Sequence, residues 1–202
     1  VKMAQTAQTT PPEVYPFRAA ALGGLKPLAP DKWNYAKARH LLVRAGFGGT
    51  PQEVEKLHQM GLYKAVDFLV EYYRQPAPPG NVDPVPPLGP DPLEARMTLR
   101  TMSSRVSAAR LSVERGLIGR LRQSWLQRMV ETPRPLQEKL ALFWHGHFAA
   151  QNNVVDNSYI MFRQNQLFRE HAAGNFGALL YGIVHDLAMI RYLDNNKNVK
   201  GD

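Results

Sequence analysis

Two histidines separated by one residue, His145 and His147, lie in the segment LFWHGHFAAQ at residues 142–151. Imidazole nitrogens bind divalent metals and transfer protons near neutral pH, so the pair is a candidate for both kinds of chemistry. On a helix, however, residues two apart point about 200° apart, and helical zinc pairs use a spacing of four. The pair therefore predicts a shared metal site only if the helix ends before Gly146.

Helical phase distinguishes the two histidines. A helix that begins near Leu136 places His147 on one stripe with apolar side chains, and His145 on the opposite side. That stripe consists of Leu136, Leu140, Phe143, Trp144 and His147. We therefore expect His147 to face the core and His145 to face solvent or a neighbouring element.

Four further polar residues fall at or near core-facing positions of the later helices: Gln164, His171, Arg191 and Asp194. A buried polar group without a partner costs about 1–3 kcal/mol, so such groups must find one another, water or an ion. The favoured interpretation is a structural hydrogen-bond network that includes Gln164 and Arg191. The alternative is a divalent-metal site made by His147, His171 and Asp194. His185 falls on the opposite face of its helix and is expected in solvent.

Helical spacing recurs from about residue 32 to residue 193, and strand-type alternation is scarce. This pattern predicts an all-α fold, a multi-helix globular bundle. The predicted helices span about 31–45, 50–60, 62–73, 93–130, 136–150, 157–172 and 175–193. Asp31 is the expected N-cap of the first helix, and Thr50 with Glu53 predicts a capping box at the start of the second.

Proline content divides the chain into four parts. Residues 1–30 predict an extended arm, residues 31–75 a small N-terminal helical unit, and residues 76–92 a linker or loop with eight prolines. Residues 93–202 form the main helical bundle, which we expect to continue beyond the chain. The chain begins VKMAQTAQTTPP, which is typical of a processed or truncated start.

The 202-residue chain carries a formal net charge of +8 and no cysteine, so disulfide and thiolate chemistry are excluded. The basic excess comes largely from arginines at 96, 100, 105, 110, 115, 120, 122 and 128. Because steps of five residues spiral around a helix, these arginines favour solvated or salt-bridged positions over one nucleic-acid-binding face. The most apolar segment contains His185, Asp186 and Arg191, so we expect no transmembrane span.

Four segments, in order, carry a family resemblance: ARHLLVRAGFGGTPQEVEKL, TPRPLQEKLALFWHGHFA, RQNQLFREHAAGNF and MIRYLDNNKNVKG, which begin at residues 38, 132, 163 and 189. Together they resemble successive blocks of the bacterial "domain of unknown function 1800" family. The resemblance implies a mostly helical, usually exported protein of uncertain activity. It also implies that relatives are longer and continue into further acidic helices.

Three functions remain open. The first is an exported helical protein that serves as a structural or assembly component of a cell-envelope or extracellular complex, located in the periplasm, envelope or medium. The second is a metal-dependent enzyme with a site around His147 and His171. The third is an anionic-polymer binder that uses the arginine-rich region, whose binding would weaken strongly with salt.

Overall fold

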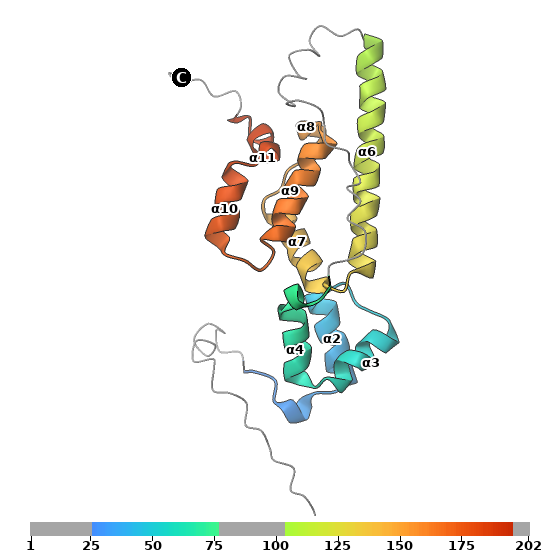
Figure 1. Ribbon diagram of the computed structural model, residues 1–202, viewed down its shortest axis with the longest axis vertical. Coiled ribbons are helices and arrows are strands. Elements are labelled where there is room, and N and C mark those ends of the chain that lie inside the picture. The colour runs from blue at the N-terminus through green and yellow to red at the C-terminus, as the bar shows by residue number, and fades with distance from the viewer. Residues whose placement is uncertain (1–25, 77–103, 196–202) are drawn as a thin grey trace, which may run out of the picture.

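The structure is a computed structural model that describes residues 26–76 and 104–195, with side chains from Ser112 onward in the second range. Every regular element in these ranges is a helix, so the protein has an all-α fold, as predicted (Figure 1). Most of the predicted arm and of the proline-rich linker lies outside the described residues, and so do Arg96 and Arg100. None of the described helices is long and apolar enough to cross a membrane.

The N-terminal unit is a compact group of short helices. They are η1 (Pro30–Lys32), α2 (Tyr35–Ala45), α3 (Pro51–Gln59), α4 (Leu62–Val70) and η2 (Tyr72–Arg74). The capping box of α3 is confirmed: the Thr50 hydroxyl accepts from the Glu53 N–H at 3.3 Å, and the Glu53 carboxylate accepts from the Thr50 N–H at 2.6 Å. The predicted N-cap of α2 is wrong, because Asp31 lies inside η1 and Asn34 accepts from the Lys37 N–H instead.

The core of this unit is entirely apolar. One stripe from each of α2, α3 and α4 meets the other two, and the buried members are Ala38, Leu42, Val54, Leu57, Ala65 and Leu69. The i, i+3 or i, i+4 spacing within each helix puts these residues on one face. Apolar periodicity therefore identifies the buried face of each of these three helices.

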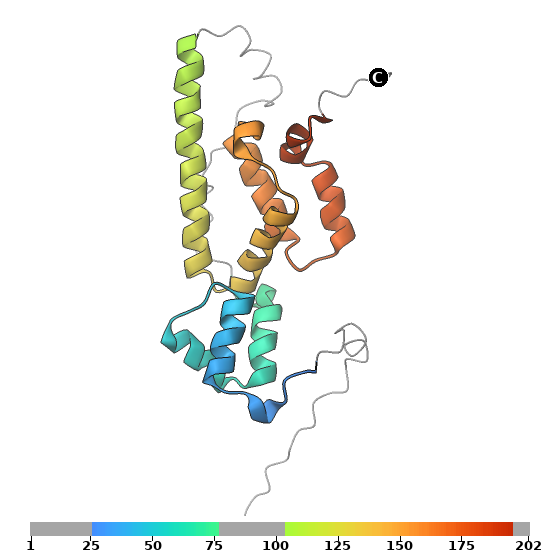
Figure 2. The ribbon, with the colours of Figure 1, turned by 180° about the vertical axis from the view of Figure 1, so that it is seen from behind.

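The larger bundle is built around one central helix. Its elements are α6 (Ser104–Glu131), α7 (Pro135–His147), α8 (Asn152–Val155), α9 (Ser158–Glu170), α10 (Phe176–Val184) and α11 (Leu187–Tyr192). Helix α9 packs against all five of the others, with α6 on one side and α10 on the other (Figures 1 and 2). Consequently α9 is buried around most of its circumference, including at Gln164, Asn165 and Arg169.

One predicted boundary in this bundle differs from the structure. Helix α6 is continuous through Gly116, in agreement with the single helix predicted there. The single helix predicted over 175–193 is instead two helices, because the chain leaves helical geometry at Asp186 and the Asp186 carboxylate caps α11 by accepting from the Met189 N–H at 2.9 Å. An aspartate at an N-cap satisfies an otherwise free N–H, which explains the new start.

The two groups of helices meet at the beginning of α7. The Arg134 Nε donates to the Gln75 carbonyl at 2.9 Å, and the Ala173 N–H donates to the Tyr72 hydroxyl at 3.3 Å. The ammonium of Lys139 lies 4.9 Å from the centre of the Phe47 ring. These contacts connect the loop between α2 and α3, and the end of the N-terminal unit, to the start of α7 and to the loop that follows α9.

Candidate functional site

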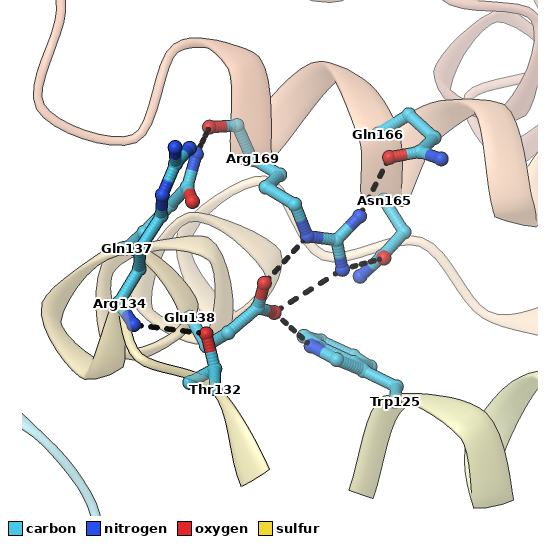
Figure 3. A network of polar contacts seen from close by, with 8 residues as sticks. All are labelled: Trp125, Thr132, Arg134, Gln137, Glu138, Asn165, Gln166 and Arg169. Atoms are coloured by element: carbon cyan, nitrogen blue, oxygen red, sulfur yellow. Dashed lines mark hydrogen bonds and ion pairs between the residues drawn. The ribbon is translucent and has the colours of Figure 1, made fainter. Parts of the chain in front are cut away.

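A buried ion pair joins α7 to α9. The Arg169 Nε donates to Glu138 Oε1 at 2.7 Å and Arg169 Nη2 donates to Oε2 at 3.2 Å, which makes a two-point contact (Figure 3). Glu138 is 0% exposed and Arg169 is 9% exposed. Removing charges from water is costly, and a bidentate pair with further hydrogen bonds is the geometry that offsets this cost best.

Three more side chains complete the arrangement, which we call the polar centre: Glu138, Arg169, Trp125, Asn165 and Gln166. The Trp125 indole N–H on α6 donates to Glu138 Oε2 at 3.0 Å. Two further guanidinium hydrogens go to the side-chain oxygens of Gln166 and Asn165, each at 2.7 Å (Figure 3). Because its carboxylate oxygens accept from side chains of α6 and α9, Glu138 of α7 ties three helices together.

A second guanidinium lies close to the polar centre. Arg128 on α6 is half-buried, and burial is the main cause that lowers its pKa. Repulsion from Arg169 lowers the pKa further, while attraction to Glu138 opposes both effects. One buried carboxylate therefore interacts with two guanidinium groups in this part of the bundle.

A cleft of about 200 Å³ lies between α6 and α9, beside the polar centre. Helix α6 contributes Arg122 and Trp125, α9 contributes Met161 and Asn165, and His145 lies at the end of α7. Asn165 thus belongs to both the polar centre and the cleft lining. The cleft offers a place where a small molecule could meet polar side chains held by several helices.

The prediction for His147 is wrong, because its side chain is exposed, whereas His145 faces a neighbouring element, which was one of its two predicted surroundings. His145 is half-buried, with its ring 5.4 Å from Trp125 and 6.1 Å from Phe168, and burial lowers its pKa. His147 is exposed and lies over the Phe143 ring at 6.1 Å, and Phe143 itself is 57% exposed. The predicted stripe was wrong because the inner face of α7 carries Glu138, Ala141 and His145, spaced by three and four residues.

The proposed metal ligands are not brought together. His171 is half-buried at the C-cap of α9, and Asp194 is exposed with a left-handed backbone (φ 58°). Within residues 26–76 and 104–195, no group of three or more histidine, aspartate or glutamate side chains is placed to hold a metal ion. The His147, His171 and Asp194 set therefore has no support from the described geometry.

The remaining predicted polar residues have separate partners. Gln164 is fully buried and its Nε2 donates to the Asp186 carboxylate at 2.8 Å. Burial raises the pKa of Asp186, and the hydrogen bonds from Met189, Gln164 and Ala188 only partly oppose this. Arg191 is half-buried and donates to the Val155 carbonyl at 3.2 Å, and His185 is exposed, as expected.

Sequence reasoning missed Glu138 and Arg169. Both are charged, so a search for apolar stripes with polar exceptions assigned neither to the core. One signal was present: both lie within the segments that carry the family resemblance, Glu138 in TPRPLQEKLALFWHGHFA and Arg169 in RQNQLFREHAAGNF. Because Glu138 and Arg169 carry opposite charges and lie on adjacent predicted helices, an ion pair between them could have been predicted.

Comparison with known proteins gives one match. A family model described as "Protein of unknown function (DUF1800)" matches residues 40–202, and this confirms the resemblance seen in the four segments. No curated protein and no solved structure matches the chain.

Proposed function

The chain belongs to the DUF1800 family, and on that premise we propose that it is an assembly component of a cell-envelope or extracellular complex. The observation that carries the proposal is an exposed apolar surface on the outer side of the bundle. Export to the envelope or medium is part of the proposal and rests on what the family resemblance implies.

We define the outer apolar surface as Phe143 of α7 with Phe176, Leu180, Tyr181 and Val184 of α10. Their exposed fractions are 57%, 51%, 42%, 71% and 63%. Trp144 connects the two helices, because its ring lies 4.8 Å from Phe143 and 5.8 Å from Phe176. Exposed apolar residues scattered singly are ordinary, whereas a connected group of this kind is typical of a binding surface.

The chemistry of α10 suggests what covers this surface. The helix reads FGALLYGIV and contains no charged side chain. Phe176, Leu180 and Val184 follow a spacing of four and form a ridge about 12 Å long at 1.5 Å per residue. A partner helix with an uncharged apolar stripe fits such a ridge by ridges-into-grooves packing.

Helix α10 also has the position that this role requires. It lies at the edge of the bundle in both views, with its inner side on α9 (Figures 1 and 2). Leu179 and Ile183, which are 1% and 4% exposed, occupy that inner side. One helix thus has an apolar inner face, which stabilises the fold, and an apolar outer face, which the fold of the described residues does not use.

Site-specific photocrosslinking in cells of the source organism tests the proposal. A photoreactive amino acid at Tyr181 should link the protein to one defined partner, and Val184→Glu should abolish that product. Two controls use exposed residues of α6. The first places the photoreactive amino acid at Val130, which is 83% exposed, and the second combines the photoreactive amino acid at Tyr181 with Leu126→Glu in place of Val184→Glu. The Val130 position should give no such product, and Leu126→Glu should leave the Tyr181 product intact.

Other outcomes would overturn the proposal. A crosslink between two copies of this chain, confirmed by a dimer mass in light scattering, would replace the foreign helix by a second copy. Absence of any product at Tyr181, or a product unaffected by Val184→Glu, would remove the outer apolar surface as the binding site. Recovery of the protein in the cytoplasmic fraction would contradict the exported location.

A further inference from the structure

A buried side-chain amide on α9 has one of its two polar atoms unpaired. Gln164 is 0% exposed, and its Nε2 donates to the Asp186 carboxylate at 2.8 Å. Its Oε1 is also buried, but it has no hydrogen-bond partner among the described residues. Buried polar atoms in native proteins are almost always satisfied, so this acceptor needs a donor. The neighbouring carboxyl group can supply that donor itself when it carries a proton.

Two neutral donors share one oxygen of the Asp186 carboxyl group. Gln164 Nε2 and the Met189 N–H both donate to Oδ2, at 2.8 and 2.9 Å. Within an amide, and within a carboxyl group, the two polar atoms lie about 2.2 Å apart. An amide and a protonated carboxyl group that share one hydrogen bond can therefore close a second one, from Oδ1–H to Oε1, when the two groups lie in one plane.

The surroundings of Asp186 favour the protonated form. The residue is 9% exposed, and burial raises the pKa of its carboxyl group. Hydrogen bonds from Met189, Gln164 and Ala188 act in the opposite direction, but they do not cancel the effect of burial. All three donors are neutral, so the carboxylate gains no charge partner in exchange for its hydration.

The charged and titratable side chains near this corner have other surroundings. Arg191 is half-buried and donates to a carbonyl of α8 at 3.2 Å, while Tyr159 and Tyr192 pack against the apolar core. The remaining ones are exposed: Asp156, Arg163, His185 and Asp194. None of these groups is a cause of the raised pKa of Asp186.

We propose that Asp186 and Gln164 form a proton-dependent latch between α9 and the corner where α10 ends and α11 begins. In the closed latch, Asp186 Oδ1 carries a proton and donates it in a hydrogen bond to Gln164 Oε1, while Gln164 Nε2 donates to Oδ2. Release of the proton to water leaves two oxygens opposite each other, and the latch opens. The Met189 N–H keeps its bond to Oδ2, so α11 stays helical while its corner loosens.

The latch holds one edge of the bundle. Helices α10 and α11 lie together on the same side of α9 in both views, and α9 packs against each of them (Figures 1 and 2). Local opening of such an edge requires the loss of only a few buried contacts. Because every group of the latch is inside the bundle, the inference does not rest on the assembly role.

Carbon-detected NMR of the isotope-labelled chain tests the latch. The Asp186 carboxyl carbon, assigned by its loss in Asp186→Asn, should titrate with a midpoint above the ordinary value of 3.8. The Gln164 side-chain amide signals should move with the same midpoint, because that amide faces the titrating group. The carboxyl carbon of Asp67, which is exposed on α4, is the control, and the Gln164 signals should not follow its titration.

The variant Gln164→Met distinguishes the latch from a single hydrogen bond. If Gln164 only donates, its removal raises the pKa of Asp186, because a donor favours the charged form. In the latch, its removal lowers the pKa of Asp186. The protonated form then loses the acceptor of its hydroxyl, and the ionised form loses an opposing oxygen.

Hydrogen exchange measures what the latch holds. Asp186→Asn keeps the latch closed at every pH, because its side-chain N–H replaces the hydroxyl donor. Protection of the α11 amides should be equal in the wild type and this variant below the folded pKa of Asp186. Above it, protection should be about fivefold to tenfold lower in the wild type, as for one lost hydrogen bond. Far-UV circular dichroism should stay the same, and Asp67→Asn should leave α11 protection unchanged.

Three results would overturn the inference. The first is a higher pKa of Asp186 in Gln164→Met, which would leave a single hydrogen bond and an ordered water at Oε1. The second is a set of Gln164 signals that does not follow the Asp186 titration. The third is equal protection of α11 in the wild type and Asp186→Asn at high pH. If Gln164→Met fails to fold, the wild-type titration and the Asp186→Asn comparison still decide.

Discussion

The N-terminal unit and the α7–α9 contact are held together by different kinds of interaction. In the N-terminal unit, α2, α3 and α4 meet through side chains such as Leu57 and Leu69, which are 2% and 1% exposed. In the bundle, the contact between α7 and α9 contains the Glu138–Arg169 ion pair, with Trp125 donating from α6. Burial of apolar area is non-directional, whereas a buried ion pair depends on the position of every donor.

The hydrophobic pattern of a helix identifies its buried face only where the surrounding core is apolar. Where the core is apolar, the positions of leucine and valine indicate which face of a helix is inside. Where a charge occupies the core, the same pattern misleads, because Phe143 is 57% exposed while Glu138, five residues earlier, is 0% exposed. Each experiment below changes one side of this contrast.

The largest effect is expected from Glu138→Gln. The variant keeps an oxygen acceptor for Trp125 but leaves the Arg169 guanidinium buried without a charge partner, which typically costs about 3–5 kcal/mol. Urea denaturation should show this loss in the free energy of unfolding. The double variant Glu138→Leu with Arg169→Leu should be less destabilised than Glu138→Gln, because it leaves neither charge behind. A single variant as stable as the wild type would contradict the stabilising role of the pair.

On the apolar side, Leu69→Ala should cost about 2–5 kcal/mol, the range for a leucine deleted from a packed core. Val70→Ala is the matched control, since Val70 is 51% exposed and should change stability by less than about 0.5 kcal/mol. Hydrogen exchange should show lost protection in α2–α4 and smaller changes in α9. Equal loss in both regions would mean that the two cores unfold as one.

Substitution of the two histidines of α7 should give a change in stability of intermediate size. His145→Ala removes a half-buried ring that contacts Trp125 and Phe168, and we expect a loss of about 1–2 kcal/mol. His147→Ala removes an exposed ring and should cost less than about 0.5 kcal/mol. Thermal unfolding of the two variants side by side measures the difference. The sequence-based phase predicts the opposite order, so the result decides between the two assignments.

Much of the fold could be predicted from the sequence because its signals are local. Thr50, Pro51 and Glu53 define the start of α3 by hydrogen bonds within one turn, and the structure shows those bonds. The end of α2 at Ala45 could also be predicted from the sequence, because Gly46 follows it directly. The break at Asp186 was missed because a long apolar run on both sides concealed an N-cap.

Much of the candidate site could not be predicted, because its contacts are distant in sequence. Glu138 meets Arg169 across 31 positions and Gln164 meets Asp186 across 22. Only the packing of α7, α9 and α11 brings these groups together, and no periodicity within one helix reveals a partner on another. Gln164 was correctly expected to be buried, but its partner was not identified.

The smallest change in stability is expected at Asp186, the second buried carboxylate of the bundle. Glu138 is paired with a cation, whereas the Asp186 carboxylate accepts from Gln164 Nε2 and the Met189 N–H, both neutral donors. Burial raises the pKa of Asp186 above its ordinary value of 3.8. The folded protein therefore holds this proton more tightly than the unfolded chain does. The contribution of Asp186 to stability is complete below the unfolded pKa and declines as pH rises through the folded pKa.

Asp186→Asn should remove this dependence while keeping an oxygen that can accept from both donors, and asparagine caps a helix about as well as aspartate. At pH 7 the variant should be slightly more stable than the wild type, by under about 1 kcal/mol. The difference should shrink as pH falls through the raised pKa of folded Asp186, because the wild-type carboxyl then becomes protonated. Asp67→Asn, at an exposed carboxylate, is the control and should show no such convergence. A variant that loses stability at pH 7 would contradict the raised pKa, because it would show that the fold stabilises the charged form of Asp186.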